Sequence, residues 1–193
     1  ISDGTSNAGI EVHGNYNLFE RNEIFHTKQD GIWFFGAYNT FRENYVHDIL
    51  HPSITSNTHV DCYMTWGWDM NTTNVLFEKN VCVNNRTTGL NALVMISRKS
   101  STEVRDLTFR NNVFVINRPV YSSVNFWGPT DSPRISNIKF INNTVVNLSG
   151  KGENGIQFVN IENATAINNL FIGFGNKNEY IPYISAGSST KVS

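Results

Sequence analysis

Short strands of alternating apolar and polar residues recur along the chain, and each is followed by the same polar signal. In one example Leu107 and Phe109 alternate with polar neighbours, and Asn112 follows three residues after the Phe. Another apolar residue, Phe114, stands two positions beyond this Asn. The same pattern, a Phe followed three residues later by Asn, occurs at Phe19–Asn22, Phe41–Asn44, Phe77–Asn80, Phe109–Asn112, Phe140–Asn143 and, with Ala replacing Phe, Ala166–Asn169. The chain therefore contains an internal repeat.

The repeat has a short minimum length and variable insertions. The anchor residues are Asn22, Asn44, Asn80, Asn112, Asn143 and Asn169, spaced by 22, 36, 32, 31 and 26 residues. In each unit an alternating strand precedes the anchor and a second short strand follows it. A third strand lies upstream, at 9–13, 31–35, 62–66, 92–96, 123–127 and 155–159. No stretch sustains a helical period, and three strands in a constant order predict parallel stacking of each strand on its counterpart in the next unit.

The anchors explain an unusual composition, with 28 Asn against 14 Gly. Where two strands meet at a sharp bend, one residue often enters the left-handed region, which Asn tolerates better than most residues. Side-chain amides stacked about 4.8 Å apart can also form hydrogen bonds from unit to unit. We therefore interpret Asn80 and its counterparts as structural corner residues and not as catalytic ones.

In these features the chain resembles the right-handed parallel β-helix proteins of the pectate-lyase-like superfamily, with their Asn ladder, over residues 9–172. The resemblance implies an all-β solenoid of about six coils with three short strands per coil. Residues 1–172 would form the β-helix and 173–193 a C-terminal cap or tail, because bare solenoid ends expose strand edges. A leucine-rich repeat would need several Leu per unit, whereas Ile, Val, Phe and Met occupy the core positions here. The start inside a repeat suggests a longer parent chain with further domains.

The net charge and the two cysteines exclude only a few classes of binding partner and of covalent framework. A net charge of −1 and a pI near 6.6 give no electrostatic argument for nucleic acid. No window is long enough for a transmembrane helix, so membrane insertion is not expected. The two Cys cannot make a disulfide framework, and Cys82 falls on an apolar repeat position. A buried free thiol is therefore favoured over a bridge to Cys62.

The upstream strand predicts a surface for carbohydrate. If Ile32 and Phe34 face the core, alternate residues point outward and are exposed. The first outward row would contain Glu11, Trp33, Met64, Val94, Asn125 and Gln157, and the second His13, Phe35, Trp66, Ile96, Trp127 and Val159. The large rings are Trp33, Phe35, Trp66 and Trp127, with Trp68 in the turn beyond. An exposed row of flat rings indicates a groove for sugar rings. The alternative is that a loop covers the rings as a second small core.

The longest insertion lies beside this surface and carries His47, Asp48, His51, His59 and Asp61. In the superfamily the active site generally lies on the outer face of this strand, between such loops, so the resemblance places the site here. For β-elimination or epimerisation of a uronic acid polymer, His59 is the candidate acid or base. Arg98 and Lys99 could hold the substrate carboxylate. The cofactor is open; Ca²⁺ is a candidate, with oxygens from Asp30, Asp61 and Asp69.

Hydrolysis is a second mechanism, because Asp30 and Asp61 occupy aligned positions in neighbouring units, about 5 Å apart. Two carboxylates this close would raise one pKa, as an acid catalyst requires. The alternative is that both cap the turn into the strand, with Asn91 continuing the row. The paired Asp, Gly-His-Gly and Arg-Ile-Lys motifs of polygalacturonases are absent, and so is the Asp-Pro-His motif of mannuronan epimerases. A zinc site from His47, His51 and His59 is disfavoured by Pro52.

Together these patterns predict a secreted or cell-surface protein that cleaves or epimerises an extended polysaccharide, with uronic acid polymers as the first candidates. A lyase-like reaction is favoured over glycoside hydrolysis. The predicted catalytic residues are His59, Asp61, Asp30 and Arg98, and the predicted substrate-binding residues are Trp33, Phe35, Trp66, Trp68, Trp127 and Lys99. The rival hypothesis is a non-catalytic polysaccharide-binding or structural module, adhesin-like or tail-like, from a larger protein.

Overall fold

All regular secondary structure in the described residues consists of parallel β-strands. The computed structural model describes residues 7–49, 60–67, 70–84, 92–98, 101–117, 122–128, 135–150, 154–174 and 184–186. Within these residues there is no helix, and every strand pairing is parallel. The chain visits three sheets in turn, and we call one such passage a coil. This is the arrangement of a parallel β-solenoid, as the repeat predicts.

The three sheets are named A, B and C in the order in which a coil visits them. Sheet A contains β1 (Ala8–His13), β4 (Asp30–Ala37), β7 (Tyr63–Thr65), β10 (Val94–Ile96), β13 (Ser122–Trp127), β16 (Asn154–Val159) and β19 (Ile184–Ala186). Sheet B contains β2 (Leu18–Glu20), β5 (Thr40–Arg42), β8 (Thr72–Glu78), β11 (Val104–Arg110), β14 (Ile135–Ile141) and β17 (Ile161–Ile167). Sheet C contains β3 (Glu23–Ile24), β6 (Tyr45–His47), β9 (Val81–Asn84), β12 (Val113–Ile116), β15 (Thr144–Asn147) and β18 (Leu170–Ile172).

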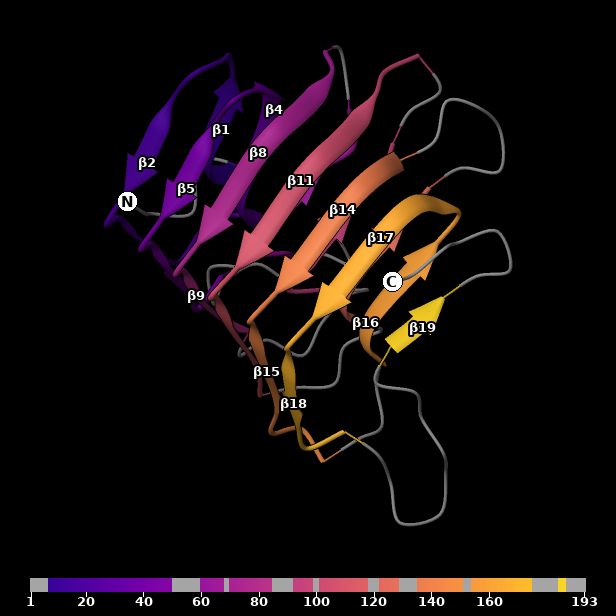
Figure 1. The fold of residues 1–193 in the computed structure, drawn as a ribbon. Helices are drawn as coiled ribbons and strands as arrows, with labels where there is room; N and C mark the ends of the chain where they lie inside the picture. The colour runs from indigo at the N-terminus through magenta and orange to yellow at the C-terminus, as the bar shows by residue number, and fades with distance from the viewer. Residues whose placement is uncertain are drawn as a thin grey trace.

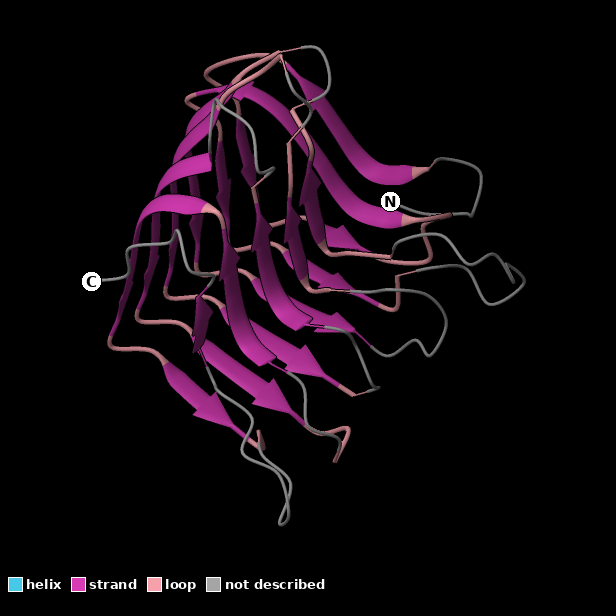
Figure 2. Ribbon diagram, turned by 90° about the vertical axis from the view of Figure 1, so that its right-hand side faces the viewer, coloured by secondary structure: helices cyan, strands magenta, loops and turns pink. Residues whose placement is uncertain are grey.

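The sheets wrap around a common interior. Figure 1 shows the strands of sheet B side by side in chain order, from β2 to β17. In Figure 2 the strands bend at shared corners from one sheet into the next. At one place β4 runs from sheet A into sheet B, where Gly36 pairs with Thr72, so that A and B form one hydrogen-bonded sheet of thirteen strands.

The interior is filled by columns of stacked apolar side chains. The predicted inward residues Ile32, Phe34, Val124, Phe126, Ile156 and Phe158 are all fully buried. The Phe three residues before each of the first five anchors belongs to another column, in which the Phe77 ring lies 4.8 Å from Phe41 and 4.5 Å from Phe109. Burying one such side chain is worth about 1.5–3 kcal/mol, so the columns supply much of the stability of the fold.

The anchor Asn residues are joined by a continuous row of hydrogen bonds. The Nδ2 of Asn80 donates to Oδ1 of Asn112 at 3.0 Å, and the backbone N–H of Asn80 donates to the same oxygen at 2.9 Å. Nδ2 also donates to the carbonyl of Phe41 in the preceding coil at 2.9 Å. The same pattern links Asn22 to Asn44, Asn44 to Asn80, Asn112 to Asn143, and Asn143 to Asn169. The four interior anchors, Asn44, Asn80, Asn112 and Asn143, are thus buried side chains whose amide donors and acceptor are used.

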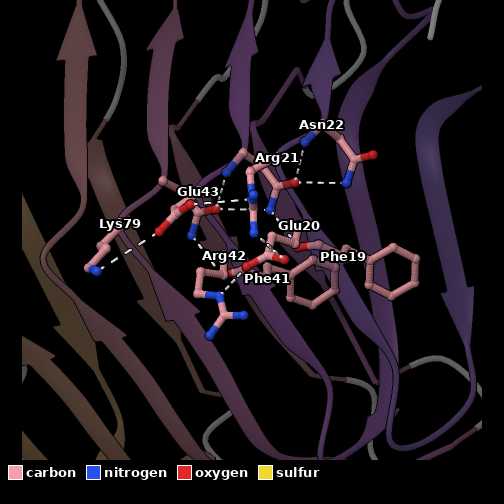
Figure 3. A network of polar contacts seen from close by, with 10 residues as sticks. Phe19, Glu20, Arg21, Asn22, Phe41, Arg42, Glu43 and Lys79 are labelled. Atoms are coloured by element: carbon pink, nitrogen blue, oxygen red, sulfur yellow. Dashed lines mark hydrogen bonds and ion pairs between the residues drawn. The ribbon is translucent and has the colours of Figure 1, made fainter.

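The left-handed residue at each corner is not the anchor, so that detail of the sequence interpretation is wrong. Positive φ belongs to the residue before it, as at Lys79 with φ 55° and Asn111 with φ 57°. This residue faces solvent while the anchor stays in the extended region and points inward. Figure 3 shows the first coils at this corner, where the outward Arg21 and Lys79 both approach Glu43, at 3.6 and 3.9 Å. The corner therefore uses two adjacent residues, one for backbone bending and one for hydrogen bonding.

A second left-handed position lies six residues before each anchor, in sheet B or at its start. It is occupied by Tyr16, Tyr38, Asn74, Asp106, Asn137 and Asn163, all with φ between 52° and 61°. The rings of Tyr16 and Tyr38 are stacked, with centroids 4.9 Å apart and 1° between their planes. The abundance of Asn is thus explained by two left-handed positions per coil as well as by the anchors.

Cys62 and Cys82 form a disulfide bond, so the prediction of a free thiol is wrong. Their Cα atoms lie 6.2 Å apart, and both side chains are fully buried. Cys62 precedes β7 in sheet A and Cys82 lies in β9 of sheet C, in the same coil. The sequence showed that Cys82 points inward, but it did not show that the opposite wall of the interior is close enough for a bridge.

The segment predicted as a cap or tail is described only in part. Phe174 is 7% exposed, and its ring packs against Phe171 at 6.1 Å. Further along, β19 pairs with β16 and extends sheet A by one strand, which Figure 1 shows in yellow. Residues 175–183 and 187–193 lie outside the described residues.

Candidate functional site

The outer face of sheet A is the predicted site, and its rows differ from the prediction in one strand. Met95 pairs with Met64 on one side and Asn125 on the other, so the outward residue of β10 is Met95. The assignment of Val94 and Ile96 to the outward rows is wrong, because both are fully buried in the main core. All residues at 92–96 are apolar, so no alternation of apolar and polar residues shows which of them face inward. A shift of one residue in the assignment exchanges the inward and outward faces of the strand.

The first coils of this face carry a second hydrophobic core. Trp33 is 9% exposed and Phe35 is fully buried, so the expectation that both are exposed is wrong. They pack with Ala8, Met64, Trp66 and Met70 in a cluster separate from the main core. Trp66 is half-buried and meets Trp33 edge to face at 5.2 Å. These rings form a second small core, as in the alternative, whereas residues 50–59 of the loop expected to cover them lie outside the described residues.

The later coils of the same face are different in character. Trp127, at the end of β13, is 56% exposed. Asn125 on the same strand is 1% exposed; its Nδ2 lies 3.6 Å from Sδ of Met95, and its Oδ1 has no hydrogen-bond partner in the structure. Arg98, just beyond the neighbouring strand β10, is 8% exposed. The indole of Trp127 is thus open to a flat apolar ligand face, whereas the amide of Asn125 and the side chain of Arg98 are buried.

Asp30 and Asp61 lie in neighbouring coils, as the sequence predicts, but they are directed at the backbone. Oδ1 of Asp30 accepts a hydrogen bond from the N–H of Asp61 at 2.6 Å, and Oδ2 accepts one from Nε1 of Trp33 at 2.5 Å. Oδ1 of Asp61 in turn accepts from the N–H of Ala92 in the next coil at 2.7 Å. Each carboxyl group thus fixes the start of the following sheet A strand, which is the capping alternative. Asn91, the expected third member, lies outside the described residues.

Burial controls the ionisation of this pair. Desolvation raises the pKa of Asp30 to about 7, opposed by the hydrogen bonds from Trp33 and Asp61. Burial also raises the pKa of Asp61 well above its ordinary value, and the neighbouring Asp30 charge raises it further. Both residues are almost completely buried, at 2% and 0% exposure. The raised pKa values are what an acid catalyst needs, but neither carboxyl group is accessible to a polymer.

Several predicted site residues fall outside the described part of the chain. These are His59, Trp68 and Lys99, together with His51 and Asp69. His47 is described and is held by acidic groups, with Nδ1 2.8 Å from Asp48 and Nε2 3.2 Å from Glu23. Among the described residues, no three His, Cys, Asp or Glu side chains are grouped to hold a metal ion. Asp30 and Asp61 do not fit a Ca²⁺ site, because both carboxyl groups are buried and both oxygens of Asp30 and Oδ1 of Asp61 accept N–H hydrogen bonds; Oδ2 of Asp61 alone has no partner.

Sequence reasoning missed a hollow on the outer face of sheet B. It has a volume of about 420 Å³ and spans β8, β11 and β14. Its lining consists of Asn74, Val75, Leu76, Asp106, Thr108, Arg110, Asn137 and Lys139. The signal in the sequence is the column of Asn and Asp six residues before the anchors, where the backbone takes positive φ without a change of pairing register.

Comparison of the chain with protein-family models, with curated proteins and with solved structures finds no match. The described residues contain no helix long and apolar enough to cross a membrane. The likeness to a parallel β-helix therefore rests on strand order, parallel pairing and the anchor hydrogen bonds of this chain alone.

Proposed function

We propose that the chain is part of a right-handed parallel β-helix of about six coils with an Asn ladder, similar to the pectate-lyase-like proteins, and that it acts on an extended polysaccharide. The polymer would lie along the outer face of sheet A. The anchor hydrogen bonds and the constant strand order support the fold, and the later coils of this face support the ligand.

The observation that carries this proposal is the exposure of Trp127. At 56% exposure it presents a large flat ring on a face where Trp33 and Phe35 are buried and Trp66 is half-buried. Stacking of a sugar ring on the indole would remove this apolar surface from water. Arg98 lies just beyond β10 of the same sheet, and a guanidinium recognises a carboxylate through paired hydrogen bonds. A uronic acid polymer is therefore the substrate class that we propose first.

The reaction proposed first is β-elimination or epimerisation of that polymer. It needs a cation beside the sugar carboxylate, a base for the C5 proton and a proton donor. Arg98 and Lys99 are proposed for the carboxylate and His59 for proton transfer. Hydrolysis by Asp30 and Asp61 ranks second, because neither carboxyl group reaches the surface.

A non-catalytic polysaccharide-binding module is the second candidate function. The specific observation in its favour is that each member of the predicted carboxylate pair is buried and uses Oδ1 to hold a backbone N–H group. A face that offers a binding ring but no accessible acid would bind a polymer without cleaving it.

A secreted or cell-surface location is part of the proposal. The buried disulfide Cys62–Cys82 supports it, because disulfides persist in oxidising compartments.

A panel of acidic and neutral polysaccharides incubated with the purified protein tests the function. Unsaturated uronide, seen by its ultraviolet absorbance, identifies a lyase, and new reducing ends without that absorbance identify a hydrolase. Solvent-proton exchange at C5 without cleavage identifies an epimerase. Retention on a polymer without any product identifies a binding module, and neither retention nor product on any member of the panel would refute the proposal.

A further inference from the structure

The hollow on sheet B lies on a different face from the site discussed above and is built by three consecutive coils. Asn74, Asp106 and Asn137 stand at the same position of β8, β11 and β14, each with positive φ. Strands in this stack are about 4.8 Å apart, so the hollow extends over about 10 Å along the axis. Its volume of about 420 Å³ lies in the range of small-molecule sites.

One wall of the hollow is a fixed row of hydrogen-bonding groups. Nδ2 of Asn137 donates to Oδ1 of Asp106 at 2.9 Å, and the Arg105 guanidinium holds the other oxygen of Asp106. In the next coil Asn163 donates to Oδ1 of Asn137 at 3.2 Å. Because these side chains are tied to one another, they present acceptor oxygens in a constant orientation. Acceptors of this kind suit a ligand that carries hydroxyl donors.

The floor of the hollow adds a small apolar surface and a cation. Leu76, Thr108 and Lys139 stack on one another in neighbouring strands. Arg110 is already paired, with Nε 2.8 Å from Glu78, whereas the exposed Lys139 makes no ion pair with any described residue. The Lys139 ammonium is thus the charge in this hollow that is available to an anionic ligand.

From these three features we infer that the hollow binds one unit of an acidic sugar. Lys139 holds the carboxylate, Asp106 and Asn137 accept hydrogen bonds from ring hydroxyl groups, and Leu76 lies under the apolar face of the ring. Inorganic phosphate is disfavoured, because at neutral pH it brings few donors and would be repelled by the Asp106 carboxylate. The site needs no residue of the sheet A face and is independent of the function proposed there.

The inference is tested by titrating the whole ¹⁵N-labelled chain with glucuronate and recording amide chemical shifts. We expect perturbations centred on Leu76, Thr108 and Lys139, with glucose and inorganic phosphate at least fivefold weaker. Lys139→Gln should weaken glucuronate binding by about fivefold to tenfold, in line with loss of one charged contact. A Trp127→Ala variant should bind glucuronate in this hollow as the wild type does.

Three outcomes would overturn the inference. They are the absence of shifts in sheet B at saturating glucuronate, equal binding by the Lys139→Gln variant, and equal binding of phosphate. Lys28→Gln, at an exposed turn, is the control for loss of one positive charge. Since Lys139 is exposed on a strand surface, its substitution should leave the amide spectrum of the folded protein intact.

Discussion

The backbone N–H of Asp61 donates a 2.6 Å hydrogen bond to the carboxyl group of Asp30, which lies in the preceding coil. Asp30 and Asp61 are spaced like a catalytic dyad, but this contact makes them part of a structural row of hydrogen bonds. Asp61 repeats the arrangement with Ala92 one coil later. The pair therefore affects stability in a pH-dependent manner, and it need not affect turnover.

Stability should fall as the pH rises from about 4 through 7. The pKa of Asp30 is about 7 in the folded protein, against an ordinary value of 3.8, so the folded state holds the proton more tightly over this window. The contribution of such a group is complete below the unfolded pKa and is lost as the pH passes the folded pKa. The same sign holds for Asp61, whose pKa is also raised. Urea denaturation at pH 4.5, 6 and 8 measures the effect.

Asp61→Asn is the matched variant for that measurement. It keeps an oxygen for the Ala92 N–H, and it places an amide where Oδ2 has no partner. We expect a larger free energy of unfolding than the wild type at pH 8 and a flatter pH dependence. If the variant also keeps full activity on a polysaccharide that the wild type converts, Asp61 has a structural role. Loss of activity with unchanged stability would instead make it catalytic.

Interior members of the anchor row should be more important for stability than the last one. Asn112→Ala removes the acceptor for two donors of Asn80 and leaves the Phe77 carbonyl without its donor. With about 1 kcal/mol per hydrogen bond and a further cost for stranded buried groups, we expect a loss of about 2–4 kcal/mol. Asn169→Ala, at the half-buried end of the row, should lose about half as much. Equal losses in urea denaturation would contradict this interpretation of the row.

The left-handed corner should become more stable when a long side chain is replaced by Asn. Lys79 has φ 55°, and its contact with Glu43 is a long, exposed ion pair of 3.9 Å. Lys79→Asn should raise the free energy of unfolding by about 0.5–1 kcal/mol, because Asn tolerates this region and the surface pair contributes little. Lys28→Asn, at an exposed position without positive φ, should give no gain. A gain at both positions would point to a charge effect.

The disulfide should be detected chemically and should stabilise the fold. Unfolded protein without reductant should bind no thiol reagent, and reduced protein should bind two equivalents. The bridge closes a separation of 20 residues, for which the chain-entropy estimate is about 3 kcal/mol. A double Cys62→Ala, Cys82→Ala variant should lose about that much in thermal or urea denaturation. Two free thiols in the untreated protein would rule the bridge out.

Sequence patterns predicted the features that depend on local repetition. Period-two alternation identified the inward positions of β4, β13 and β16, and the recurring Asn identified the buried corner. The alternation could not show which residues of β10 face inward, because all five residues at 92–96 are apolar. In that strand only pairing with its neighbours decides which side chain faces out.

Long-range features of the site were beyond the sequence. The burial of Trp33 and Phe35 depends on packing with Met64, Trp66 and Met70, which come from other coils and turns. The bridge between Cys62 and Cys82 depends on the width of the interior, and this width cannot be deduced from the length of the repeat. The hollow on sheet B contains a left-handed residue that recurs in three coils, which becomes visible only when φ is known.

Affinity electrophoresis through gels that contain single polysaccharides tests the central claim most directly, using the wild type, Trp127→Ala and Tyr16→Ala. Tyr16 is the control because it is an exposed ring, at 77%, on another part of the surface. At least one acidic polysaccharide should retard the wild type and Tyr16→Ala, while Trp127→Ala should migrate as it does in a plain gel. Equal retardation of Trp127→Ala and wild type would contradict a polysaccharide site on the outer face of sheet A.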